Sequence, residues 1–187
     1  LKVIEKRDDG FHNIRSGITF ISLFDIVNIK KSKKLSINYS GPFKPLKGIY
    51  KDCIIFKTLN FLNLKNKINL EINIEKNIPV QGGLGSASTN AAALIKGLEK
   101  MDIIPKNKNQ YYAKLGADIP CFLFNNNCLV TGIGEKISFQ VFPNYYFLLV
   151  KPSFNNSTKE MYKKLNLNFR LSNQIINYEE DKINDND

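Results

Sequence analysis

The residues best suited to chemistry form one stretch of small side chains in the middle of the chain, Pro79–Thr89. A strictly alternating segment, 68–74, precedes it and is typical of a half-buried strand. An apolar stripe at helical spacing follows it, formed by Ala91, Leu94, Ile95 and Leu98. The stretch is therefore predicted to be a glycine-rich loop between a strand and the start of a helix.

Such a loop can bind phosphate, because glycines let the backbone approach a ligand and the first N–H groups of a helix attract anions. Ser86, Ser88 and Thr89 could cap the helix or donate to a phosphate. The competing interpretation is a tight turn with a serine cap and no ligand. The spacing fits neither a P-loop, since no lysine follows the glycines, nor a dinucleotide loop, since Ser88 stands where the last glycine belongs.

Two further residues are candidates for chemistry. Asp118 is a single acid between Gly116 and Pro120, where a helix must break. It is either a turn or capping aspartate, or a carboxylate near the anion site that orients or deprotonates a hydroxyl. His12, the only histidine, follows the turn signal Asp8–Gly10 and lies beside Phe11, which makes base recognition an option beside an ordinary loop position.

The composition indicates a folded protein with an anionic partner. The 187 residues are 43% hydrophobic and carry a formal net charge of +10. The three cysteines have no metal-binding spacing and read as buried thiols, and no apolar run has the length of a membrane span. These features predict a cytoplasmic protein with no membrane partner, whose anionic partner is a nucleotide, a phosphorylated metabolite or nucleic acid. The lysines are scattered along the chain, so a small molecule with no nucleic-acid partner is the favoured interpretation.

The other elements are predicted from periodicity and turn signals. Strands are expected at 1–5 and 14–22, and two more, at 26–29 and 35–39, are expected to form a hairpin around a lysine run. Helices are expected at 52–62, 110–115 and 157–165. The segment 132–135 is predicted to be a plain hairpin turn rather than a second phosphate loop, followed by strands at 136–142 and 145–150.

Several motifs together resemble one family, the GHMP kinases. The loop Pro79–Thr89 resembles their ATP loop. The segments Asp8–His12, Leu115–Pro120 and Gly132–Glu135, in this order, resemble the branch that phosphorylates a cytidine diphosphate-linked methylerythritol in non-mevalonate isoprenoid synthesis. The resemblance covers the chain to about Leu165. It implies an α+β fold: a GHMP-kinase N-terminal nucleotide-binding domain over 1–150 with a left-handed β-α-β unit, and the start of a ferredoxin-like C-terminal domain over 151–187.

The resemblance also implies roles for individual residues. Asp118 would accept the proton of the substrate's 2-hydroxyl, while Phe11, His12, Thr158 and Tyr162 would bind the cytidine-diphosphate-linked substrate. ATP and Mg²⁺ would be the cofactors, with the metal ligands and the oligomeric state unassigned. The ATP phosphates would lie against the loop residues Pro79, Val80, Gln81, Gly82, Gly83, Leu84, Gly85, Ser86, Ala87, Ser88 and Thr89.

The chain departs from the family in three places. The family's catalytic lysine would precede Leu1, its late glycine-rich motif would follow Asp187, and Ser86 and Ala87 replace glycines usual in this branch. The chain therefore resembles an interior fragment, and residues 1–187 alone are not expected to turn over substrate. Two alternatives stay open: another GHMP enzyme of the homoserine or mevalonate type, and a basic nucleic-acid-binding module, which would need clustered basic and aromatic residues.

Overall fold

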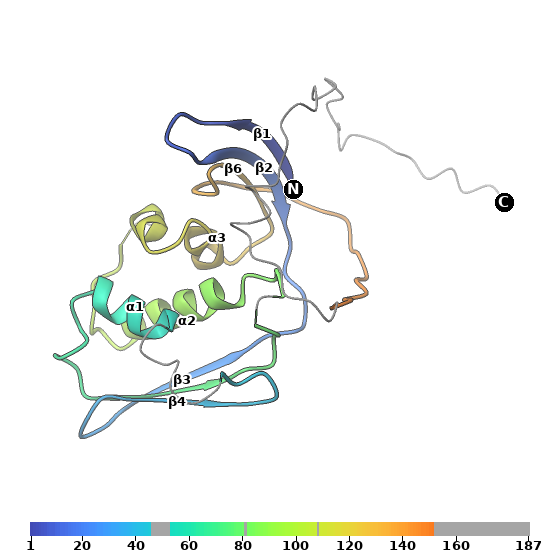
Figure 1. Ribbon diagram of the computed structural model, residues 1–187. Helices are drawn as coiled ribbons and strands as arrows, with labels where there is room; N and C mark the ends of the chain where they lie inside the picture. Colours follow the sequence, from blue (N-terminus) through green and yellow to red (C-terminus); the bar gives the residue numbers. More distant parts are fainter. Residues whose placement is uncertain (46–52, 81, 108, 152–187) are drawn as a thin grey trace.

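The computed structural model describes residues 1–45, 53–80, 82–107 and 109–151. Two β-sheets enclose the helices, one below them and one above them (Figure 1). The lower sheet has three strands and the upper sheet has four, so the α+β class is confirmed. The predicted helix at 157–165 lies outside the described residues.

The three-stranded sheet has β5 (Leu70–Glu75) between β3 (Ile26–Lys31) and β4 (Ser36–Ser40). The predicted hairpin of the two segments around the lysine run is therefore wrong. Both segments are strands, but β3 pairs with β5 antiparallel and β4 pairs with β5 parallel. The apolar face of β5 explains why this strand lies between the other two. Its Leu70, Ile72 and Ile74 are buried, and a central strand buries such a face more completely than an edge strand does.

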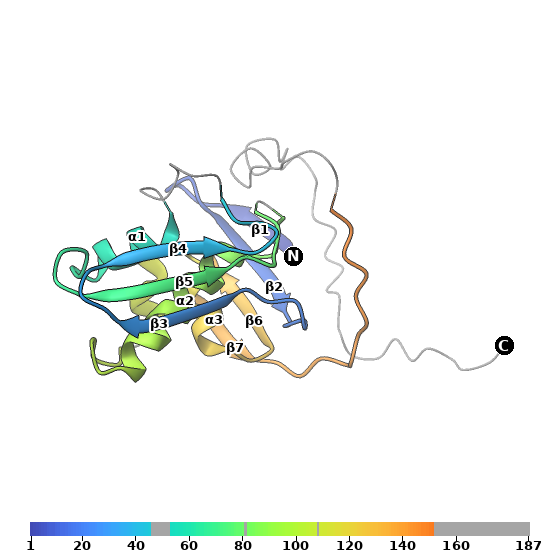
Figure 2. The ribbon, with the colours of Figure 1, turned by 90° about the horizontal axis from the view of Figure 1, so that it is seen from below.

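The parallel pair is connected through α1 (Ile54–Phe61), which gives a β-α-β unit. Figure 2 shows β4 and β5 running in the same direction with the helices behind the sheet. The path from β4 through α1 to β5 turns in the left-handed sense (Figure 2). Almost all such crossovers are right-handed, so this connection is a distinctive mark of the fold.

The main core lies between this sheet and the helices α1 and α2 (Ser86–Lys100). The stripe predicted for α2 is confirmed, since its four residues have no exposed surface: Ala91, Leu94, Ile95 and Leu98. The apolar spacing of 52–62 predicts that Cys53, Phe56, Leu59 and Leu62 mark the packed side of this helix, and of these only Leu59 is buried. Helix α1 buries Ile55, Thr58 and Leu59 instead. The helix therefore presents a face rotated by about one residue toward the core.

The four-stranded sheet has the order β1 (Lys2–Lys6), β2 (His12–Ile18), β6 (Cys128–Gly132) and β7 (Lys136–Phe139). Between α2 and β6 the chain forms a 3₁₀ helix, η2 (Asn109–Lys114), and a short helix, α3 (Ile119–Phe124). Cys121 of α3 packs with Cys128 and Val130 of β6 in a second, smaller core. Helix α3 thus joins the two halves of the molecule (Figure 1), since it also contacts α2.

Two predicted strands differ from the structure. Strand β2 ends at Ile18 rather than at 22, because the chain then leaves the upper sheet and crosses to β3 of the lower sheet. Residues 145–150 do not form a strand, and Tyr146, Leu148 and Val150 are largely exposed. A strand needs a partner edge for its N–H and C=O groups, and the described residues provide none here. None of the described helices is both long enough and apolar enough to cross a membrane.

Candidate active site at the start of helix α2

The glycine-rich loop connects the end of β5 to α2, as the sequence predicts. Gly83 and Gly85 have φ values of +74° and +67°, which side chains rarely adopt. Gly85 is the N-cap residue of α2, and no side chain caps the helix. The serine cap that the tight-turn interpretation expects is therefore absent from α2. The first N–H groups of α2 are left to another partner, and the exposed residues 82–84 lead directly to them.

The three hydroxyl groups of the first turn have different surroundings. Thr89 donates to the backbone carbonyl of Ser86 over 2.9 Å. The Ser86 hydroxyl accepts a hydrogen bond from the Lys76 ammonium group over 2.7 Å. Ser88 is half-buried and lies on the side of the helix that faces the segment before α3. The hydroxyl of Thr89 therefore donates to a carbonyl of its own helix, whereas the hydroxyl of Ser86 contacts a lysine that precedes the glycine loop.

Asp118 occupies the N-cap position of α3, but its carboxylate makes no capping hydrogen bond. Its backbone is helical, with φ −82° and ψ −17°, instead of the extended conformation that capping residues usually have. The carboxyl group reaches the surface, yet crowding by its neighbours removes part of its hydration and raises its pKa. The alternative of an ordinary capping aspartate is therefore not supported.

In the structure the segment that contains Asp118 lies beside the N-terminus of α2. A methyl group at Gly116 would lie 3.9 Å from Oγ of Ser88, in the first turn of the helix. A methyl group at Gly85 would lie 2.6 Å from Cζ of Phe122, in α3. The two helices therefore start side by side, and the carboxylate and the bare amides belong to one region of the surface. This is the arrangement on which a phosphoryl-transfer interpretation depends.

The turn between β6 and β7 forms another wall of this region. A methyl group at Gly134 would lie 3.7 Å from Oδ1 of Asp118. Glu135 accepts a hydrogen bond from the backbone N–H of Ile133 over 2.7 Å, so its carboxylate folds back over its own turn. The two strands pair in register across it, and the prediction of a plain hairpin turn is confirmed. Glycine suits position 134 because its φ is +118°, whereas a methyl group there would make only ordinary contacts with Ala117 and Asp118.

The predicted substrate-binding pair, Phe11 and His12, lies at the start of β2. Phe11 is 57% exposed, and His12 pairs with Lys6 across the β1–β2 hairpin. Ile14 lies opposite Gly132, so this end of β2 and the β6–β7 turn are at the same end of the upper sheet. His12 therefore lies at the same end of the upper sheet as the turn that approaches Asp118. Gln81, Thr158 and Tyr162 lie outside the described residues.

Sequence reasoning missed a buried ion pair beneath the loop. The side chains of Asp25 and Lys76 are 1% and 5% exposed and form a salt bridge. Asp25 also accepts hydrogen bonds from the backbone N–H groups of Asn77 and Ile78, over 2.7 and 2.9 Å. The only available signal was that Asp25 is the single acidic residue between Asp9 and Asp52, inside an apolar run.

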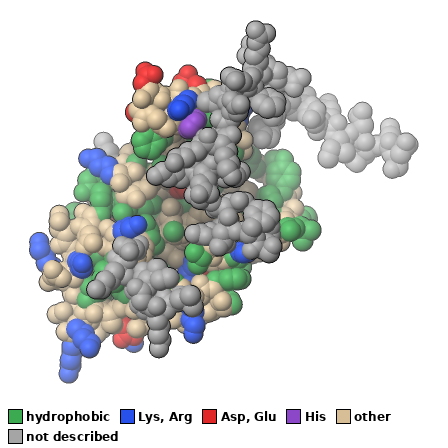
Figure 3. All heavy atoms as spheres, viewed as in Figure 1, with side chains coloured by type: hydrophobic (Ala, Val, Ile, Leu, Met, Phe, Trp, Pro, Cys, Tyr) green, Lys and Arg blue, Asp and Glu red, His purple; other side chains and the backbone are tan. Residues whose placement is uncertain are grey.

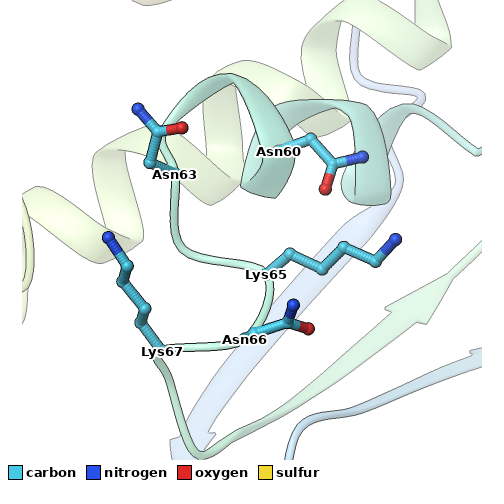
Figure 4. A pocket seen from close by; sticks show the side chains of 5 residues that line it. All are labelled: Asn60, Asn63, Lys65, Asn66 and Lys67. Carbon is cyan, nitrogen blue, oxygen red and sulfur yellow. The ribbon is translucent and has the colours of Figure 1, made fainter.

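Other surface features lie away from this site. A hollow of about 230 Å³ is lined by polar residues between α1 and β5, at the opposite end of β5 from the glycine loop. Its lysines, Lys65 and Lys67, point in different directions (Figure 4), so they do not converge on a ligand. Lys and Arg side chains are scattered singly over the face seen in Figure 3 and form no stripe there. No group of three metal-binding side chains occurs among the described residues.

Residues 53–126 match the family model described as the GHMP kinases N terminal domain. This match agrees with the left-handed β-α-β unit and the glycine loop, so residues 53–126 are similar to a GHMP-kinase N-terminal domain. Within that class the chain resembles one enzyme, 4-diphosphocytidyl-2-C-methyl-D-erythritol kinase. It is 39% identical over 175 residues to the enzyme of that name from Clostridium botulinum, and 40% identical over 173 residues to the one from Fervidobacterium nodosum.

These alignments cover 89% and 88% of the chain, and the chain spans 61% of the length of each relative. A solved structure titled as a 4-(cytidine 5'-diphospho)-2C-methyl-D-erythritol kinase superimposes with a TM-score of 0.60 at 23% identity. That superposition covers 75% of the chain and 51% of the solved structure, and it shows a shared fold. The resemblance inferred from four sequence motifs is therefore confirmed.

Proposed function

We propose that this chain takes part in the transfer of the γ-phosphoryl group of ATP to the 2-hydroxyl of 4-diphosphocytidyl-2-C-methyl-D-erythritol. The names of the relatives supply the substrate, and the GHMP-kinase domain supplies the reaction class. The observation that carries the proposal is the approach of the Asp118 segment to the uncapped start of α2. A phosphoryl donor and an acceptor hydroxyl can meet only where an anion site and a proton acceptor share one region.

In this proposal the loop and the first turn of α2 bind the ATP phosphates. Uncapped N–H groups and the helix dipole favour negative charge there, and Gly83 and Gly85 allow the close approach. The catalysis is mainly positioning and charge stabilisation, because a phosphoryl group passes through a loose transition state. Loop residues 79–84 would contact the phosphates through their backbone, and the half-buried Ser88 through its hydroxyl.

Asp118 would accept the proton of the attacking hydroxyl. Its pKa is raised by partial desolvation, which makes its carboxylate a better proton acceptor than a fully hydrated one. Phe11, which is mostly exposed, and His12 would contact the cytosine base from the β1–β2 hairpin. Thr158 and Tyr162 would complete that contact, as the family resemblance suggests.

The described residues offer no cage of protein ligands for a metal ion. Mg²⁺ usually keeps several waters and binds through phosphate oxygens and one or two carboxylates. We therefore propose that Mg²⁺ arrives as its ATP complex and supplies charge neutralisation to the phosphates. We further assign residues 1–150 to the ATP-binding domain and 151–187 to the start of a second domain, in a cytoplasmic protein with three free thiols.

A kinase assay of the intact gene product tests the proposal, with ADP release measured in the presence of ATP and Mg²⁺. We expect turnover with the cytidyl substrate and none with mevalonate or homoserine. Asp118→Asn should lower kcat by about 100- to 10,000-fold. Asp102→Asn is the matched control, because Asp102 is an exposed carboxylate just beyond the far end of α2.

Phosphorylation of mevalonate or homoserine in preference to the cytidyl substrate would contradict the assignment and favour another GHMP enzyme. Equal losses in Asp118→Asn and Asp102→Asn would contradict the role given to Asp118. Binding to RNA with a steep salt dependence and no effect of ATP would support the nucleic-acid alternative instead.

A further inference from the structure

The buried ion pair lies at the base of the glycine loop and connects its two ends. Lys76 is the first residue after β5, and Ser86 is the first residue of α2, so residues 77–85 form the loop between them. The hydrogen bond from Lys76 Nζ to Ser86 Oγ, 2.7 Å long, closes this loop at its base. Asp25, which comes from the segment before β3, is in contact with the ammonium group and with the backbone of the first two loop residues.

The backbone of Lys76 is also fixed. Its N–H donates to the carbonyl of Ser40 over 2.9 Å, and its own carbonyl accepts from the N–H of Phe43 over 3.1 Å. Gly41, with φ +86°, packs so closely here that a methyl group would lie 2.5 Å from the Lys76 carbonyl oxygen. The backbone that carries this side chain is therefore fixed, and the ammonium group is buried rather than mobile at the surface.

The chemistry of the donors determines the direction of the bond to Ser86. A lysine ammonium group has three N–H donors and no acceptor, so the Ser86 oxygen must accept. The hydrogen of the Ser86 hydroxyl is then directed elsewhere, and it makes no hydrogen bond to any of the described residues. Ser86 is half-buried at the uncapped start of α2, where a bound anion would lie.

We infer that Lys76 and Asp25 are positioning residues that hold Ser86 as a hydrogen-bond donor for a phosphate oxygen of the nucleotide. Asp25 neutralises the buried ammonium group and fixes the first loop residues, and Lys76 orients the Ser86 hydroxyl. This inference rests on the proposed function, because it deepens the same phosphate site. It assigns Ser86 a role in binding the nucleotide and gives the buried ion pair a role beyond stability.

The first test compares Ser86→Ala, Ser86→Thr and Ser16→Ala in the intact protein. Binding of MgADP is measured by calorimetry, and KM for ATP and kcat are measured separately. Ser86→Ala should weaken MgADP binding and raise KM for ATP by about tenfold or more, the scale of a lost hydrogen bond to a charged group. Its effect should fall mainly on KM rather than on kcat, since the bond acts in binding. Ser86→Thr should restore affinity. Ser16 is a buried serine of β2 and provides the matched control.

The second test is a cycle that couples Lys76 to Ser86. Replacing the pair together, as Asp25→Asn with Lys76→Met, removes both charges and the donor but leaves no unpaired buried charge. This variant should fold and should lose about as much MgADP affinity as Ser86→Ala. Adding Ser86→Ala to it should cause no further loss, because both changes remove the same interaction.

The outcomes separate this inference from the proposed function. A parent protein that binds no MgADP and no ATP would overturn both. A parent that binds nucleotide, with a Ser86→Ala variant of equal affinity, would overturn the inference and leave the proposed function standing. Fully additive losses in the cycle would also overturn it, since Lys76 would then act on the fold and not through Ser86.

Discussion

Gly85 and Phe122 are in such close contact that a methyl group on Gly85 would lie 2.6 Å from Cζ of the phenylalanine ring. Gly85 also has φ +67°, so it is fixed both by its backbone and by its neighbour. The contact joins the start of α2 to α3, the helix that Asp118 begins. The relative position of the phosphate loop and the carboxylate therefore depends on the absence of a side chain at this residue.

Gly85→Ala should destabilise the protein by about 2–5 kcal/mol, the sum of a left-handed alanine and an overpacked contact. Urea unfolding measures this change. Gly83→Ala is the matched control, because Gly83 has φ +74° but nothing within 4 Å of the added methyl group. It should cost only the backbone term of about 1–2 kcal/mol. Equal losses in the two variants would show that Phe122 does not restrict position 85.

The three thiols should differ sharply in reactivity. Cys121 and Cys128 are 3% and 0% exposed, and burial raises the pKa of both, so little thiolate forms at neutral pH. Cys53 is half-buried just before α1. Ellman's reagent should therefore label one thiol in the native protein and three after denaturation. Cys53→Ser should abolish the native reaction, and labelling of two or more thiols at one rate would contradict the buried second core.

Local patterns predicted the elements around the site well, because each depends on neighbours in the chain. The alternation before the loop and the stripe of α2 correspond directly to the buried faces of β5 and α2. The two strands around the lysine run were also found, but their partner was wrong. Pairing joins residues far apart in the sequence, and nothing in 26–39 shows that β5 lies between them.

In the candidate site, too, local features could be predicted and contacts between distant residues could not. The loop and Asp118 were found because small residues and an isolated acid have local signatures. The buried pair of Asp25 and Lys76 was missed, since the two residues are 51 positions apart and each alone resembles an ordinary surface charge. Propensity left open whether Ser86, Ser88 or Thr89 caps the helix, whereas Gly85, in a left-handed conformation, takes the N-cap position.

Asp118→Asn should stabilise the protein at neutral pH while it removes activity. The folded state raises the pKa of this carboxyl above the ordinary value of 3.8, so the folded state disfavours its ionised form. Its favourable contribution is present below pH 3.8 and is lost as the pH rises through the higher folded value. Thermal unfolding of the two proteins should therefore diverge as the pH rises from 3 to 7, with Asp118→Asn the more stable. Parallel curves would show that the carboxyl is fully hydrated.

Breaking the buried pair on one side should cost far more than breaking a surface pair. Asp25→Ala leaves the Lys76 ammonium group buried without a counter-charge and frees two backbone N–H groups, so we expect a loss of about 3–5 kcal/mol in urea unfolding. Asp9→Ala is the comparison, because Asp9 and Arg7 form a salt bridge with side chains 46% and 41% exposed. Solvent screens that pair, and Asp9 otherwise accepts only an exposed hydrogen bond from the N–H of Phe11, so its removal should cost only a small fraction of the loss in Asp25→Ala. A small loss in Asp25→Ala would mean that water reaches Lys76, and the base of the glycine loop would then be less rigid than the contacts around it require.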